Sequence, residues 1–168
     1  DLEPDVVIDM ICFTLESAQH LAEALQGRVQ HFLHCGSIWV HGHSTEVPTT
    51  EDQPRRPFGQ YGTRKAAIEA YLLKKAGVDG FPVTVLHPGH IVGPGWNPIN
   101  AAGTVNPEVF GKLARGEELT LPNLGMETLH HVHADDVAQA FVNAMHYRSS
   151  AIGESFHVVS AKAVTLHG

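Results

Sequence analysis

Three short apolar segments in the first half of the chain have the pattern of buried strands. They lie at residues 5–10, 29–34 and 82–87, and few polar residues interrupt them, as is typical of parallel strands covered on both faces. Between them, residues 17–26 and 61–76 carry apolar side chains at helical spacing, and a glycine follows each segment. This alternation predicts right-handed βαβ crossovers and a parallel sheet with flanking helices, which is an α/β fold.

The pattern changes after Pro98, where the elements become shorter and mixed. We predict helices over residues 107–115 and 137–146, and strands over residues 118–122, 128–133 and 154–160. A boundary near residue 94 therefore divides the chain into residues 1–93, which carry the parallel sheet, and residues 94–168, a small α+β portion.

Composition and charge narrow the classes of protein to consider. Hydrophobic residues make up 43% of the chain, which is enough for a core, and Lys+Arg 11 against Asp+Glu 18 gives a net charge of −7. A binder of nucleic acid needs a basic surface, so we expect none here. No apolar run approaches the roughly 20 residues that cross a bilayer, and the chain opens without a signal peptide, so we expect no membrane partner. Cys12 and Cys35 lie in apolar segments, which predicts buried free thiols in a reducing cytoplasm.

Tyr61 and Lys65 form the sharpest candidate for chemistry. They lie four residues apart at the start of a predicted helix, so their side chains project from one face. An ammonium near a phenol favours the phenolate, and we therefore expect the pKa of Tyr61 to lie below its usual value of about 10. Such a tyrosine can act as an acid or base near neutral pH. The same spacing also occurs on solvated helix faces, which is the alternative for an isolated match.

Two further segments are predicted to meet this pair. Ser37 follows the second strand directly, and a loop that begins at Pro88 follows the third. Because the carboxyl ends of parallel strands lie at one edge of the sheet, we expect Ser37, Tyr61 and Lys65 to converge there.

Four motifs follow one another along the chain: residues 32–42 (FLHCGSIWVHG), Tyr61-x-x-x-Lys65, residues 87–94 (HPGHIVGP) and residues 131–138 (HVHADDVA). Their order resembles the extended short-chain dehydrogenase/reductase family, and more narrowly its NAD-dependent epimerase/dehydratase group. The resemblance runs over nearly all of the chain. It implies a partial Rossmann-like sheet, with residues 1–93 as the C-terminal half of a dinucleotide-binding domain and residues 94–168 as part of a substrate-binding domain.

The resemblance also implies a role for each candidate residue. Tyr61 would be the catalytic acid/base, Lys65 would hold the nicotinamide ribose and lower the pKa of Tyr61, and Ser37 would bond the reacting oxygen. Hydride would pass between a substrate carbon and the nicotinamide of NAD or NADP. The remaining cofactor-binding residues would be Ile11 and Cys12 near the pyrophosphate or adenosine portion, and Pro88, Gly89 and Ile91 beside the nicotinamide.

The implied function is an NAD(P)-dependent oxidoreductase, epimerase or dehydratase that acts on a hydroxyl or keto group of a small molecule, with sugar nucleotides as one substrate class. The resemblance further implies a homodimer through residues 17–26 and 61–76, whose small side chains permit close helix approach. The alternative is a non-catalytic fragment or a regulatory binding module that keeps the fold without a competent cofactor site.

The chain departs from the family pattern at three places. Gly36 and His41 replace residues of the family's Ser-Ser-x-x-Val-Tyr-Gly, although Ser37 is kept. The glycine-rich turn that receives the pyrophosphate has no match before residue 27, so binding of NAD or NADP by this chain is in question. We therefore expect this chain to be a piece of a longer protein. In the piece by itself, residues 5–10 would lack a neighbouring strand on one side and would form an edge of the sheet. A natural protein of this length, whose edge strand pairs with that of a second copy, is the alternative.

Several histidines and an arginine pair leave alternatives open. His131, His133 and His157 could hold zinc together with an aspartate, but the helix-capping interpretation of this junction is favoured and no metal is assigned. The histidines that flank the predicted site could carry protons or serve only as loop polarity; they are His41, His43, His87 and His90. Arg55-Arg56 would be solvated, or would meet a phosphate of the substrate.

Overall fold

The computed structural model describes residues 3–44 and 46–168, which form two compact units. Unit 1 comprises Asp1–Pro88 and Gln139–His157, and unit 2 comprises Gly89–Ala138 and Val158–Gly168. The chain therefore leaves unit 1 at the end of its third strand and returns to it later. No helix among the described residues has the length and apolarity needed to span a bilayer.

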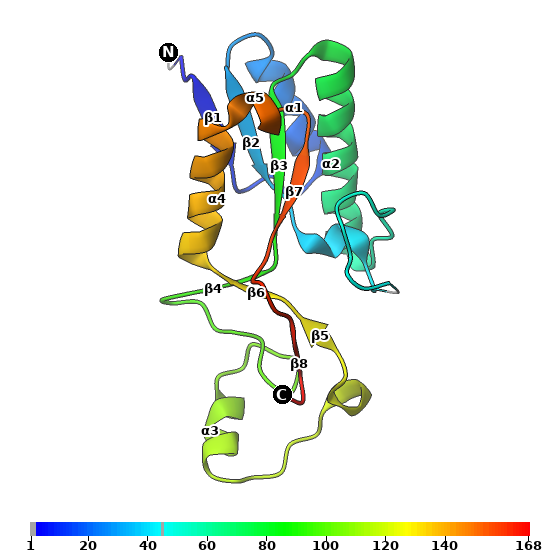
Figure 1. The fold of residues 1–168 in the computed structure, drawn as a ribbon, viewed down its shortest axis with the longest axis vertical. Helices are drawn as coiled ribbons and strands as arrows, with labels where there is room; N and C mark the ends of the chain where they lie inside the picture. The colour runs from blue at the N-terminus through cyan, green and yellow to red at the C-terminus, as the bar shows by residue number, and fades with distance from the viewer. Residues whose placement is uncertain (1–2, 45) are drawn as a thin grey trace. The chain divides into compact units, whose positions relative to one another are not determined.

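Unit 1 is built on a four-stranded sheet (Figure 1). Its order is β1-β2-β3-β7, and β2 pairs in parallel with both β1 and β3. The strands are β1 (Val6–Asp9), β2 (His31–Cys35), β3 (Val83–Pro88) and β7 (Ser155–Val158). The predicted α/β class with a parallel sheet and flanking helices is confirmed.

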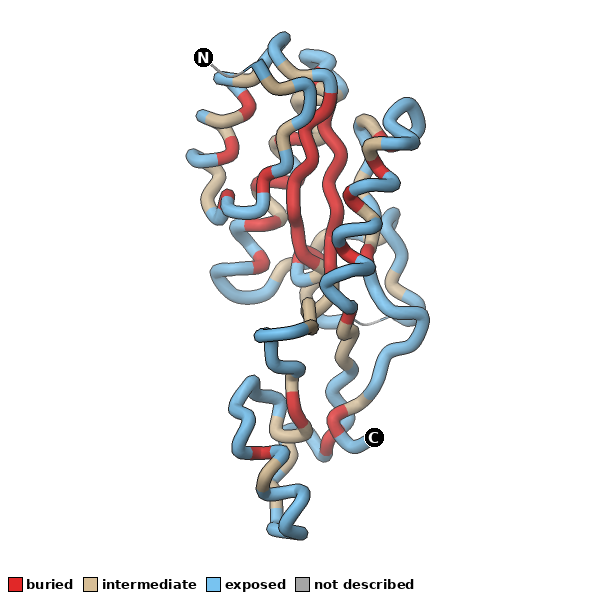
Figure 2. The backbone as a smooth tube through the Cα atoms, turned by 90° about the vertical axis from the view of Figure 1, so that its left-hand side faces the viewer, coloured by how far each residue is buried: buried red, intermediate tan, exposed pale blue. Residues whose placement is uncertain are grey.

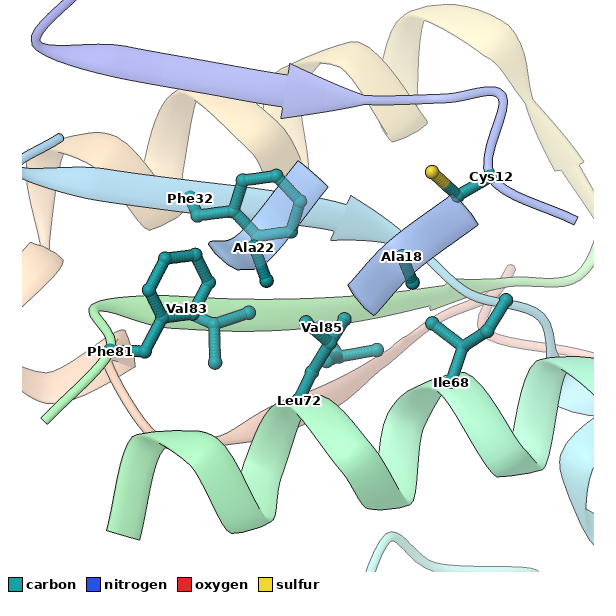
Figure 3. Packing of buried hydrophobic residues seen from close by; sticks show 9 residues of the cluster. All are labelled: Cys12, Ala18, Ala22, Phe32, Ile68, Leu72, Phe81, Val83 and Val85. Atoms are coloured by element: carbon teal, nitrogen blue, oxygen red, sulfur yellow. The ribbon is translucent and has the colours of Figure 1, made fainter. Parts of the chain in front are cut away.

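Two helices, α1 (Leu15–Leu25) and α2 (Gly59–Asp79), pack against this sheet and against each other. Thr14 caps α1, since its side chain accepts the backbone N–H of Ser17. Figure 3 shows how the small residues of α1 and the aliphatic residues of α2 meet the sheet. The core cluster contains Cys12, Ala18, Ala22, Phe32, Ile68, Leu72, Phe81, Val83 and Val85.

The helix α2 is longer than the sequence predicts. Gly77 was expected to end it, yet the helix continues to Asp79 and ends at Gly80, which adopts the left-handed conformation with φ +65°. The backbone N–H of Gly80 bonds back to the carbonyl of Ala76, which satisfies the last turn. Gly80 and not Gly77 therefore provides the C-terminal cap.

The strands of this sheet differ in burial. Every residue of β2 and β3 is buried, as predicted, and these strands form the continuous buried segments of Figure 2. The prediction of burial on both faces is wrong for β1: Val6 and Ile8 are 37% and 45% exposed, and of its residues only Asp9 is buried. The reason is position, because β1 is an edge strand with β2 as its single neighbour in the described sheet.

Unit 2 has two small sheets, each of two strands. The strand β4 (His90–Val92) pairs in parallel with β6 (His131–His133), and β5 (Thr128–Leu129) pairs antiparallel with β8 (Val164–Thr165). The one predicted strand over residues 128–133 is thus divided between two sheets.

The helices of the second half match the sequence better than the strands do. They are α3 (Glu108–Ala114), α4 (Ala134–His146) and the short α5 (Arg148–Ala151). The strand predicted over residues 118–122 is wrong, because residues 118–121 join no strand and the short helix η2 (Pro122–Gly125) follows. Pro122 lacks a backbone N–H and is well suited to the first turn of a helix.

Candidate active site

Ser37 lies just beyond the carboxyl end of β2 and is 6% exposed. It caps the short helix η1 (Ile38–His41), since its Oγ accepts the backbone N–H of Trp39 at 3.3 Å. The chain turns sharply there because the strand ends and a helix begins within two residues. This turn fixes the Ser37 hydroxyl at the edge of the sheet where the sequence places it.

Lys65 enters the same edge from the second turn of α2. Its side chain is almost fully buried, and Nζ donates to the backbone carbonyls of Cys12 at 3.0 Å and Cys35 at 2.8 Å. Burial lowers the pKa of the Lys65 ammonium below its usual value. Lys65 thereby joins the loop after β1 to the end of β2, two residues before Ser37.

Tyr61 lies one turn before Lys65 and is 46% exposed. Its ring has aromatic neighbours on two sides, with centroid distances of 6.4 Å to Phe13 and 6.4 Å to Trp39. Partial burial raises the pKa of the Tyr61 phenol, while the polar side chain of Ser37 acts in the opposite direction. The predicted lowering of this pKa is therefore wrong: desolvation has the largest influence and raises the pKa, and the Lys65 ammonium is directed at two backbone carbonyls.

The three predicted catalytic residues are thus brought together within unit 1. The Tyr61 ring faces Trp39, the residue whose N–H the Ser37 hydroxyl accepts, and Lys65 bonds the carbonyl at the strand end that precedes Ser37. They come from a strand end and from a helix start that are separate in sequence. A phenol, a hydroxyl and an ammonium at one strand edge form a set that can move a proton to or from an oxygen atom.

Behind Ser37 lies a chain of buried charged and polar side chains. The backbone N–H of Ser37 donates to His87 Nδ1 at 3.0 Å, and His87 Nε2 lies 2.9 Å from Glu69 Oε1. Arg55 binds both carboxylate oxygens of Glu69, with Nη2 2.6 Å from Oε1 and Nε 2.9 Å from Oε2. Burial alone would raise the pKa of Glu69, but the hydrogen bonds from His87 and Arg55 lower it to about 2. His87 and Arg55 are therefore structural partners of a buried carboxylate, which corrects loop polarity for His87 and solvation for Arg55, whereas Arg56 is exposed as expected.

Asp9, which sequence reasoning missed, organises the loop that follows β1. Its Oδ1 accepts the backbone N–H groups of Ile11 at 3.0 Å and Cys12 at 2.9 Å, and its Oδ2 bonds His34 Nδ1 at 2.7 Å. Burial would raise the pKa of Asp9, but these hydrogen bonds lower it to about 2. An acidic residue at the end of an apolar strand was the available signal. Of the two cofactor residues predicted in this loop, Ile11 is 80% exposed and can offer its side chain to a ligand, whereas Cys12 is buried.

The other predicted cofactor residues follow β3. Pro88 is the last residue of that strand and belongs to unit 1, whereas Gly89 and Ile91 belong to unit 2. Gly89 allows a close backbone approach, because a Cβ there would lie 2.5 Å from the carbonyl oxygen of His130. Ile91 pairs with Val132 in the β4–β6 sheet.

The contacts of the histidines oppose the zinc alternative. His131 Nε2 accepts a backbone N–H at 3.0 Å, and His133 Nδ1 accepts the N–H of Asp135 at the start of α4. His157 instead faces His41, with their Nε2 atoms 2.8 Å apart. No group of three histidine, cysteine or acidic side chains in residues 3–44 and 46–168 is arranged as a metal site.

Comparison with known proteins gives several matches. The sequence model of the NAD dependent epimerase/dehydratase family matches residues 9–158. The dTDP-D-glucose 4,6-dehydratase of Bos taurus is 24% identical over 138 residues, which are 82% of this chain and 37% of that protein. The chloroplast stem-loop binding protein of 41 kDa b of Arabidopsis thaliana is 29% identical over 166 residues, or 98% of this chain and 40% of that protein.

A solved structure supports the fold independently. The dTDP-glucose 4,6-dehydratase of Bacillus anthracis, determined in complex with NAD, superposes with a TM-score of 0.80 at 18% sequence identity. The superposition covers 97% of this chain and 53% of the Bacillus anthracis enzyme. The chain therefore spans about half the length of that enzyme, and less than half the length of the two relatives described above. Because the family model covers most of the sequence, the chain belongs to the NAD dependent epimerase/dehydratase family.

Proposed function

We propose that this chain carries the catalytic residues of an NAD- or NADP-dependent enzyme that transforms a hydroxyl or keto group of a sugar nucleotide. The observation that carries the proposal is that Lys65 bonds the end of β2 two residues before Ser37, while the Tyr61 ring faces Trp39, whose N–H Ser37 accepts. The names of the dehydratase relatives support the substrate class. In this proposal residues 1–93 contribute to cofactor binding and residues 94–168 to substrate binding.

The residues at this edge fit a nicotinamide nucleotide. Lys65 has three N–H donors and uses two of them for the carbonyls of Cys12 and Cys35, which leaves one for a ribose hydroxyl. The exposed Ile11 offers an apolar surface, and Pro88 ends the neighbouring strand. When bound, the nicotinamide supplies a hydride donor or acceptor.

The protein's own residues would handle the proton. Because the pKa of Tyr61 is raised, its phenol is protonated at neutral pH and can donate from Oη to a carbonyl oxygen of the substrate. Ser37 would hydrogen-bond the same oxygen from the strand end and hold it beside the phenol. Taking a proton from a hydroxyl, the reverse direction, would require an ammonium such as Lys65 to stabilise the phenolate.

The proposal is tested by cofactor binding and by one substitution. Calorimetry with NAD+ and with NADP+ is expected to detect binding of one of them. Tyr61→Phe is expected to lower turnover of dTDP-D-glucose by about 10²- to 10⁴-fold with unchanged cofactor affinity, because it removes the proton that is transferred. Tyr71→Phe is the matched control, since Tyr71 lies on the same helix and packs against the core.

Two results would contradict the proposal. Equal turnover in Tyr61→Phe and the unmodified protein would remove the role of Tyr61. Absence of binding for both dinucleotides would favour the alternative of a binding module that keeps the fold. The net charge of −7 does not favour stem-loop binding as that alternative, because phosphates need basic partners.

We also propose a homodimer through α1 and α2, and a cytoplasmic location. The small side chains of α2 support the dimer, since Ala66 and Ala67 are half-buried and Ala70 is exposed. The two buried free cysteines, Cys12 and Cys35, fit a reducing compartment. Sedimentation of the unmodified protein and of Ala70→Arg tests the dimer: loss of a dimer in the variant is expected, and a monomer in both contradicts it.

A further inference from the structure

We propose that His87 is a positioning residue for Ser37, and that Glu69 and Arg55 hold His87 in the tautomer this requires. The inference deepens the proposed function and rests on it, because it assigns a means by which the Ser37 hydroxyl is held for proton transfer. It also accounts for Gly36, a residue at which the chain departs from the family pattern.

The hydrogen bonds define the state of the imidazole. His87 Nδ1 accepts the backbone N–H of Ser37, so it carries no proton in this arrangement. The proton is then on Nε2, which faces Glu69 Oε1 at 2.9 Å and donates to it. Arg55 keeps Glu69 ionised by binding both of its oxygens. The carboxylate thus selects the Nε2–H tautomer, and that tautomer presents an acceptor to Ser37.

The hydrogen bond from the Ser37 N–H to His87 follows directly after the last backbone hydrogen bond between β2 and β3. The backbone N–H of Gly36 still donates to the carbonyl of Leu86 at 2.7 Å, as the pairing of β2 with β3 requires. At Ser37 the chain turns into η1, and a side chain of β3 replaces a backbone carbonyl as the acceptor. Without this acceptor the Ser37 N–H would be a buried donor with no partner, which costs free energy and loosens the turn.

Gly36 provides the space in which His87 lies. A Cβ at this position would be 2.3 Å from Nδ1 and 2.6 Å from Cε1 of His87, and 3.2 Å from the side chain of Val85. His87 is fully buried, so its ring cannot move aside without disturbing the core. Gly36 and His87 therefore fit together as a pair, and any side chain at residue 36 would displace the ring.

Two amide substitutions separate the two hydrogen bonds of His87. In His87→Asn the carbonyl oxygen can take the place of Nδ1 and still accept from Ser37, whereas in His87→Gln the amide nitrogen can reach Glu69 while the acceptor for Ser37 is lost. His31→Gln is the matched control. His31 is also buried in the sheet, but it lies at the start of β2 and bonds Thr84 at 2.8 Å.

Hydrogen exchange of the Ser37 amide gives a readout that is independent of activity. We expect exchange at Ser37 to be at least about 10-fold faster in His87→Gln than in the unmodified protein and in His87→Asn, with the amide of Leu33 unchanged. With NAD+ and dTDP-D-glucose, we expect kcat to fall about 10²-fold in His87→Gln at unchanged KM, and to recover largely in His87→Asn. His31→Gln should lower stability without this split between kcat and KM.

The result that overturns the proposal is equal Ser37 exchange in His87→Gln and in the unmodified protein, or equal loss of kcat in both His87 variants. If the variants do not fold, the nitrogen shifts of His87 in the unmodified protein decide, because an Nδ1–H tautomer contradicts the proposal and an Nε2–H tautomer supports it. Absence of turnover in the unmodified protein would contradict the proposed function alone, since exchange and tautomer still report on how Ser37 is held.

Discussion

Unit 1 and unit 2 each contain an arginine paired with a glutamate, in contrasting surroundings. In unit 1 the side chains of Arg55 and Glu69 are 23% and 3% exposed, and the pair continues to His87. In unit 2 the side chains of Arg115 and Glu117 are 61% and 45% exposed. A pair surrounded by water contributes little because solvent screens it, whereas removing one partner of a buried pair leaves a charge without compensation. The same chemical pair is thus part of the buried structure in unit 1, whereas in unit 2 it contributes almost nothing to the free energy of unfolding.

The apolar core and the histidines show the same contrast. The cluster around Phe32 and Leu72 lies entirely in unit 1, while the sheets of unit 2 have two strands each. In the described part of the chain, burial lowers the pKa of four histidines in unit 1 and of one in unit 2; these are His31, His34, His41 and His157, and His131. We infer that unit 1 is held by a dense buried interior that is sensitive to acid, and unit 2 by smaller contacts.

The largest expected effect comes from the core. Phe32→Ala should lower the free energy of unfolding of unit 1 by about 3–5 kcal/mol, because Phe32 is fully buried and its removal leaves a cavity. Phe110→Ala in unit 2 should cost about 1 kcal/mol or less, since Phe110 is 42% exposed. Each unit has one tryptophan, so urea unfolding can be followed by Trp39 fluorescence in a Trp96→Phe background and by Trp96 in a Trp39→Phe background. Equal losses for the two phenylalanines would remove the contrast.

Acid should affect unit 1 next most strongly. Burial lowers the pKa of His41 to about 4, and Arg55, His157 and His87 act in the same direction against Glu69. The unfolded chain therefore binds a proton that folded His41 does not. Stability from this group is full above about pH 6.5 and is lost as the pH falls towards 4, by about 3 kcal/mol there.

His41→Gln tests this origin of the acid sensitivity. The amide can still bond His157 but does not titrate, so unfolding of unit 1 measured between pH 7 and pH 4 should take up one proton fewer than in the unmodified protein. An unchanged pH dependence would show that His41 is not the source.

The two arginine–glutamate pairs give the smallest effects and the most direct comparison. Arg55→Ala should lower the free energy of unfolding by about 2 kcal/mol. Glu69 then still has its hydrogen bond with His87 but has lost the positive charge that compensates its own. Arg115→Ala should change stability by less than about 0.5 kcal/mol. Urea unfolding in 0.1 M and 1 M salt measures both, and the Arg55 effect should persist at high salt. A larger loss for Arg115→Ala than for Arg55→Ala would reverse the comparison.

The candidate site was partly accessible from the sequence. Tyr61 and Lys65 could be paired because four residues make one turn of a helix, and Ser37 because it follows an apolar strand. The network behind them could not be found in this way, since Ser37 and His87 are 50 positions apart and His41 and His157 are 116 apart. The periodicity of a strand predicts that such side chains are buried, but it does not predict which buried side chains contact one another.

The sequence by itself determined the alternation of strands and helices, the parallel sheet and the helical spacing of Tyr61 and Lys65, because these depend on local periodicity and on the geometry of one element. The tertiary structure alone decided how far the side chains of β1 are exposed, that Arg55 binds Glu69, and that the pKa of Tyr61 rises. Exposure, ion-pair partners and desolvation depend on which neighbours surround a residue, and those neighbours come from distant parts of the chain.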